Sequence, residues 1–150
     1  MKAITTLMLV LLCWLNADMA VYQSSYSTEP VVEDEEPVTI TLTIYNPVED
    51  QCDEDPLVTA NNWTIDTVAL KAGDVRWMAL SRDLLSRWGG QFNYGDTILV
   101  QAGDMDIDGP WVIADTMNKR YTERGDLLFH QKVRTLGKWK NVRISRINES

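Results

Sequence analysis

The chain has 150 residues and a mass of 17.1 kDa, enough for one domain and too short for two full ones. Apolar residues make up 45% of it, so a packed core is expected and wholesale disorder is excluded. One histidine and two cysteines exclude histidine-rich metal sites and a disulfide framework. The formal charge of −8 argues against general nucleic-acid binding, whose affinity comes mainly from lysine and arginine on phosphates.

The first 20 residues are predicted to be an export signal. Lys2 precedes an apolar run, 3–15, which is shorter than the roughly 20 helical residues that cross a bilayer. A cationic start, a short apolar run and small residues after it are typical of a secretory signal peptide, and the alternative is a buried N-terminal helix. We therefore expect a secreted or periplasmic, cell-envelope protein with no integral membrane span in the mature chain. The residues beside Cys13 do not suit a lipid anchor.

Residues 21–37 are predicted to be an acidic, flexible spacer. Serines, prolines and the run Glu33–Glu36 make this segment polar and self-repelling. Once the signal is removed, Cys52 is the only thiol, so no disulfide is expected.

Charge is also uneven along the chain. Residues 1–70 contain one base and 12 acids, whereas residues 71–150 contain 13 bases and 10 acids.

The folded domain is expected to span residues 38–148 and to consist mainly of strands. Val38 to Tyr45 alternates between apolar residues and threonines, which is the period of a half-buried strand. Short apolar runs bounded by turn residues predict further strands at 57–60, 77–80, 97–101, 111–114, 126–129 and 137–147. Six or seven short strands indicate a compact barrel or sandwich.

One short helix is predicted after residue 80. Ser81 is a suitable N-cap, and Leu84, Leu85 and Trp88 then fall on one helical face. The pair Gly89–Gly90 is expected to end this helix.

Two aspartates are the strongest candidates for chemistry. Asp115 ends one predicted strand and Asp126 begins the next, so each lies beside a polar loop where a groove can expose it. Apolar neighbours raise the pKa of a carboxyl group and can make it a proton donor near neutral pH. Two such groups on one groove can cleave a glycosidic bond. The alternative is that both are turn-forming residues at strand ends.

Two other features, an acidic segment and a histidine, have structural alternatives. The segment Asp104–Gly109 matches the first half of a calcium loop, and Asp115 falls at its twelfth position. Because its flanks are predicted strands, we interpret it as an acidic hairpin turn. His130 follows Asp126 by four positions and would share its face on a strand, where it could tune the carboxyl group. It could equally be a solvated residue.

The predicted loop between the two aspartates carries bases around an aromatic residue. Lys119, Arg120 and Arg124 surround Tyr121, and a ring flanked by cations suits stacking on a sugar and holding an anionic group. A solvated turn is the alternative. The bases of residues 132–146 are interpreted as a solvated strand face that could also favour anionic polymers.

At these residues the sequence resembles the three-aspartate ("3D") domain of membrane-bound lytic transglycosylase A, which is similar in turn to rare-lipoprotein-A-like double-psi β-barrels. The resemblance lies in an apolar strand ending in Asp115-Thr116, a loop, and Asp126 opening the next strand eleven positions later. Segments 78–81 and 94–100 also resemble the family, and the resemblance covers about residues 38–147. It implies an all-β, six-stranded double-psi β-barrel with one short helix.

The sequence departs from the family pattern at three places. The family's first aspartate falls on Ser81, and the nearest acid is Asp83. A glycine-rich loop is replaced by residues 117–124, and Gly125 stands where the family usually has an apolar residue.

The resemblance implies a peptidoglycan-cleaving domain of the lytic transglycosylase type, without metal or organic cofactor. Asp126 would then be the acid/base, and Asp115 would stabilise positive charge or orient the substrate. The expected substrate-binding residues are Tyr121, Trp111, Lys119, Arg120, Ser81 and Asp83. A non-catalytic glycan-binding module is the alternative, and a calcium-stabilised interaction domain is a third. We expect a monomer whose partner is peptidoglycan or a related glycan.

Overall fold

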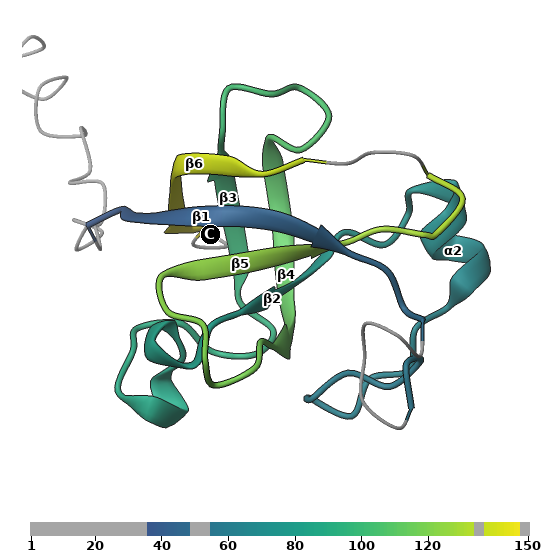
Figure 1. Cartoon of the computed structure of the whole chain (residues 1–150), viewed down its shortest axis with the longest axis horizontal. Coiled ribbons are helices and arrows are strands. Elements are labelled where there is room, and N and C mark those ends of the chain that lie inside the picture. The colour runs from purple at the N-terminus through teal and green to yellow at the C-terminus, as the bar shows by residue number, and fades with distance from the viewer. Residues whose placement is uncertain (1–35, 49–54, 134–136, 148–150) are drawn as a thin grey trace, which may run out of the picture. The chain divides into compact units, whose positions relative to one another are not determined.

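The structure is a computed structural model that describes residues 36–48, 55–133 and 137–147. Six strands close into a β-barrel, with one short helix, α2, beside it (Figure 1). The strands are β1 (Val38–Tyr45), β2 (Trp77–Leu80), β3 (Thr97–Gln101), β4 (Gly109–Thr116), β5 (Arg124–Leu128) and β6 (Trp139–Arg146). The expectation of an all-β, six-stranded barrel with one short helix is confirmed.

The order of strands around the barrel is β1-β5-β2-β4-β3-β6. The pairs β1/β5 and β2/β4 are parallel, and the other four pairs are antiparallel. Parallel pairing between strands far apart in sequence brings β5 against the first strand of the domain. The two segments that carry Asp126 and Asp115 are therefore separated only by β2.

Apolar side chains from every strand fill the barrel. In β1, Ile40 and Leu42 are buried, and the alternating residues Thr39, Thr41 and Thr43 are more exposed, as strict alternation predicts. The largest fully buried side chains are Phe92, Leu42, Met78, Leu80, Leu85, Ile98, Ile107, Ile113, Leu127, Leu128, Ile144 and Val100. Because interior and exterior residues alternate, the polar residues of these strands face outward, where a site can form.

The helix lies elsewhere than predicted. Helix α2 spans Thr67–Ala72, where Asp66 caps its N-terminus by accepting hydrogen bonds from the N–H groups of Val68 and Ala69. The segment after Ser81 instead forms two 3-10 turns, η2 (Arg82–Leu84) and η3 (Ser86–Trp88). The Ser81 side chain makes no cap bond there, so the prediction of a capped helix was wrong. Gly89 ends η3 in the left-handed region, as expected of a terminating glycine.

Several predicted boundaries also differ. The expected strand at 57–60 is a single bridge between Val58 and Thr64. β4 and β5 extend toward each other beyond the apolar runs, so the loop between them is only 117–123. The predicted signal at 1–20, most of the spacer at 21–37, and both cysteines lie outside the described residues. Within the described part of the chain, no helix has the length and apolar character needed to cross a membrane.

Candidate functional site

Four residues lie in one row across the outer face of four adjacent strands. Thr43 of β1 pairs with Asp126 of β5, Asp126 pairs with Ala79 of β2, and Ala79 pairs with Asp115 of β4. The register of β2 and β4 shifts within this row: Met78 pairs with Ile113, but Ala79 pairs with Asp115. The extra residue in β4 turns Asp115 outward, onto the face that carries Asp126. Only the methyl group of Ala79 stands between the two aspartates, whose Cα atoms are two strand spacings, or roughly 10 Å, apart.

Asp126 is half-buried, and its carboxyl group is influenced by one positive and one negative side chain. Burial raises its carboxyl pKa to about 6, with the Arg124 charge lowering this pKa and the Asp115 charge raising it further. The Thr43 hydroxyl donates a hydrogen bond to Asp126 Oδ1. Among the described residues no group donates to Oδ2, so this oxygen is available to hold a proton. A carboxyl group with a pKa near 6 exchanges protons readily around neutral pH.

Asp115 is held by three hydrogen bonds. Its Oδ1 accepts from the backbone N–H groups of Ala60 and Thr116, both at 2.8 Å, and its Oδ2 accepts from the Tyr45 hydroxyl at 3.3 Å. The Ala60 N–H comes from a tight turn closed by hydrogen bonds between Thr59 and Trp63. Donors from three different parts of the chain thus fix this carboxylate, whereas Asp126 has a single donor among the residues that the structure describes. The two acids are in different environments, as a division of roles requires.

Thr43 offers a direct test of how the Asp126 carboxyl group is tuned. The change Thr43→Val keeps the side-chain shape and removes the hydroxyl donor to Oδ1. In the wild type this hydrogen bond stabilises the charged form of Asp126. We expect the Asp126 pKa to rise by about one unit, because a hydrogen bond to a charged group contributes about 1.5 kcal/mol. NMR titration of the side-chain carboxyl carbon measures this pKa. The control Thr43→Ser keeps the donor and should titrate like the wild type; identical titration of the valine variant would contradict the assignment.

Two of the three cations predicted around Tyr121, namely Arg120 and Arg124, do contact its ring. The Cζ atoms of Arg120 and Arg124 lie 4.8 and 5.3 Å from the centroid of the Tyr121 ring, and Arg120 donates to the Tyr121 hydroxyl at 2.8 Å. Arg120 and Lys119 are exposed. Because Arg124 precedes Asp126 by two positions in β5, this group of side chains is continuous with the outer row.

Ser81 and Asp83 hold the loop that carries these cations. Ser81 is fully buried, and its hydroxyl accepts a hydrogen bond from the Arg124 N–H at 3.1 Å. Asp83 Oδ2 accepts one from the Glu123 N–H at 2.9 Å. Glu123 has a positive φ of 51°, which the Asp83 bond helps to hold. Both residues thus fix the β4–β5 loop through its backbone, and neither shares a hydrogen bond with Asp115 or Asp126.

Trp111 is not placed to bind a ligand by stacking. Only 2% of its surface is exposed, its indole N–H donates to the Ile107 carbonyl at 2.7 Å, and the Arg76 guanidinium lies 4.3 Å from its ring. The alternation of β4 directs this side chain into the barrel, whereas Asp115 faces outward after the register shift. Trp111 therefore does not lie on the face that carries the two aspartates, and it lines a separate groove beside α2 instead.

The acidic segment 104–109 forms a turn whose carboxylates bind its own backbone. Asp108 accepts from the N–H groups of Ala102 and Gly103, and Asp104 accepts from the Trp139 indole. Asp115 is bonded elsewhere, as described above. No group of three or more potential metal ligands occurs among the described residues. The calcium-loop alternative therefore lacks a ligand set in this part of the chain.

His130 lies beyond β5, which ends at Leu128. Its Nδ1 accepts a hydrogen bond from the Lys132 N–H at 3.1 Å. The strand spacing that would align it with Asp126 does not continue so far, and the expected influence of His130 on Asp126 is not seen among the causes of the raised pKa.

Sequence reasoning missed the partners of the two aspartates. Thr43 and Tyr45 belong to the outward face of a strand that was correctly predicted, so that face was the available signal. Ala60 contributes a backbone N–H, and no side-chain pattern could have marked it. A separate groove of about 230 Å³ lies between α2 and the β4–β5 side of the barrel, lined by residues such as Leu70, Arg76 and Phe129, and neither aspartate lines it.

No protein-family model matches the chain, and no curated protein matches it in sequence.

Proposed function

We propose that this domain cleaves peptidoglycan strands by the lytic transglycosylase reaction, with Asp126 as the acid/base. The observation that carries the proposal is the shared outer row of Asp126 and Asp115, in which burial raises the pKa of Asp126 to about 6. The resemblance of segments 111–129 to the three-aspartate domain supports the same reaction. It also suggests that the six-stranded barrel has the double-psi topology of that family.

In the proposed reaction, protonated Asp126 donates its proton to the glycosidic oxygen as the bond from this oxygen to the anomeric carbon breaks. A hydroxyl group of the same sugar then attacks the anomeric carbon and returns its proton to Asp126. An anhydro ring forms, no water is consumed, and the acid is regenerated. The fixed carboxylate of Asp115 would stabilise positive charge on the sugar ring or orient the substrate.

A non-catalytic glycan-binding module is the second candidate. It is favoured by Ser81, which occupies the position of the family's first aspartate and is fully buried. In such a module Tyr121, Arg120 and Lys119 would hold the glycan, and Asp126 would not transfer a proton.

A product assay separates the two candidates. The chain is incubated with purified peptidoglycan, and the soluble products are analysed by mass spectrometry. Cleavage should release fragments that end in anhydro sugars, which are lighter than hydrolytic products by one water because none is added. Retention of the protein on the polymer without soluble fragments would support the binding module. Fragments with ordinary reducing ends would contradict the proposed chemistry.

A further inference from the structure

Two pairs of arginines stack on exposed or half-buried aromatic rings in neighbouring segments. Arg82 and Arg87 lie with their Cζ atoms 5.1 and 5.4 Å from the Trp88 ring, in addition to the Tyr121 group described above. Trp88 is 41% exposed. We call the set of Arg82, Arg87, Trp88, Arg120, Tyr121 and Arg124 the arginine–aromatic surface.

Backbone contacts join the two halves of this surface. The Ser81 N–H donates to the Arg124 carbonyl at 2.9 Å, and the Ser81 hydroxyl accepts from the Arg124 N–H. Asp83 binds the Glu123 N–H, as noted above. The η2–η3 segment and the β4–β5 loop therefore form one end of the barrel as a unit, beside the strand that carries Asp126.

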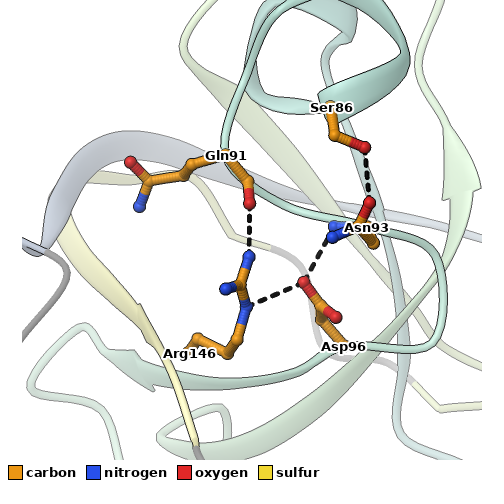
Figure 2. Close-up of polar contacts among 5 residues, drawn as sticks. All are labelled: Ser86, Gln91, Asn93, Asp96 and Arg146. Atoms are coloured by element: carbon orange, nitrogen blue, oxygen red, sulfur yellow. Dashed lines mark hydrogen bonds and ion pairs between the residues drawn. The ribbon is translucent and has the colours of Figure 1, made fainter. Parts of the chain in front are cut away.

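The turn that carries Trp88 is braced against the barrel (Figure 2). Arg146 of β6 forms an ion pair with Asp96 at 2.9 Å and donates to the Gln91 carbonyl. Asp96 accepts from the Asn93 N–H at 2.8 Å, and Ser86 donates to the Asn93 side chain at 2.5 Å. A turn held at both sides loses little conformational freedom when it binds a ligand, which favours affinity.

The arginines of the surface are available to anions. The ion pair found among the described residues is that of Arg146 with Asp96, and no carboxylate of that part of the chain lies within 4.0 Å of the four surface arginines. Segments 81–88 and 118–124 together contain five bases and two acids, in a chain whose net charge is −8. A guanidinium group stacked on a ring still presents its N–H edge, which binds a carboxylate in a bidentate manner.

We propose that the arginine–aromatic surface binds the carboxylate groups of an acidic glycan and so positions the strand across the Asp126 site. Aromatic rings suit the apolar faces of sugars, and guanidinium groups suit the carboxylates attached to them. This inference rests on the proposed function, since it names the substrate class for the same site. Nucleic acid is the less favoured anion because the rest of the chain is acidic.

The test uses two glycans that differ in charge. Peptide-free peptidoglycan strands carry one carboxylate per disaccharide, and chito-oligosaccharides of matched length are neutral. Calorimetric titration measures both affinities with the Asp126→Asn chain, in which cleavage should be slower by about 10²–10⁴-fold. We expect at least tenfold tighter binding of the charged strand, with a preference that falls as salt rises. Equal affinity for the two glycans, or tighter binding of single-stranded nucleic acid, would overturn the inference.

Arginine variants localise the binding. The double change Arg87→Gln with Arg120→Gln removes one cation from each half and should weaken binding of the charged strand at least tenfold, without altering binding of the neutral one. The matched control, Lys140→Gln with Arg143→Gln, removes two exposed cations from β6 and should change neither affinity. An equal loss of affinity for the charged strand in both double variants would overturn the assignment of binding to the arginine–aromatic surface. If the wild type releases anhydro products but binds the charged and neutral glycans equally, only this inference is wrong. If it binds the charged glycan more tightly but releases no anhydro products, only the proposed reaction is wrong.

Discussion

Asp126→Asn should lower the rate of anhydro-sugar release by about 10²–10⁴-fold, because the amide cannot donate a proton to the leaving oxygen. The substitution keeps the side-chain shape, and the asparagine carbonyl can still accept the hydrogen bond from Thr43. The rate is measured from soluble products on purified peptidoglycan. Asp106→Asn is the matched control, since Asp106 is exposed and remote from the row, and it should retain full activity. Equal rates for the two variants would exclude Asp126 as the proton donor.

The pH profile of the wild-type rate follows from the same carboxyl group. As the donor, Asp126 must be protonated, and burial raises its pKa to about 6. The rate should therefore fall through pH 6 and decrease about tenfold for each further pH unit. An Asp115→Asn change removes a negative neighbour that raises this pKa, so its profile should shift to lower pH. A rate that increases between pH 6 and pH 8 would contradict the assignment.

The charged carboxyl group of Asp126 should also destabilise the folded domain at neutral pH. Its pKa is about 6 in the folded chain and near 3.8 when unfolded, so its contribution to stability is greatest below pH 4 and is lost as pH rises to 6. Asp126→Asn should therefore have a higher melting temperature than the wild type at pH 8 and a similar one at pH 4. This pattern of lost activity with gained stability is typical of a group held in an unfavourable environment for function.

The second large effect is expected at Gly90, in the turn that carries Trp88. A Cβ atom there would lie 2.1 Å from the carbonyl carbon of Leu84 and 2.3 Å from its oxygen, which are backbone atoms. The turn is closed by hydrogen bonds from the Gly90 N–H to Leu85 and from the Phe92 N–H to Leu84, so it cannot open without losing them. Gly90→Ala should destabilise the domain by about 3 kcal/mol and lower its melting temperature by roughly 10 °C.

Gly89→Ala is the control for this change. Gly89 has a φ of 93°, but apart from its two chain neighbours no described residue has a heavy atom within 4 Å of the position that an alanine Cβ would take, so the substitution brings backbone strain without a clash. We expect a loss of about 1 kcal/mol, clearly smaller than at its neighbour. Thermal unfolding followed by circular dichroism compares the two. Equal losses of unfolding free energy in the two variants would contradict the prediction, because they would mean that the close contact with Leu84 does not destabilise the domain.

The strands could be predicted from sequence because their signal is local. Alternation along Val38–Tyr45 and the apolar runs at 77–80 and 97–101 match the strands observed. The helix was predicted in the wrong place because Leu84, Leu85 and Trp88 also suit two 3-10 turns packed on the core. In the structure, Phe92 exchanges backbone hydrogen bonds with Leu84 and Ser86, and these tertiary contacts favour the two 3-10 turns over a continuous helix.

The order of residues along the chain was enough to mark the candidates for acid–base chemistry, because Asp115 directly follows one apolar run and Asp126 directly precedes the next. Only the folded barrel shows that both acids lie on the same outer face. The shared face depends on parallel pairing between distant strands and on one extra residue in β4, because a shift of a single residue turns a side chain to the opposite face of a sheet. The parallel pairing of β1 with β5 also brought Thr43 to Asp126, since which partner a strand meets is set by packing around the whole barrel.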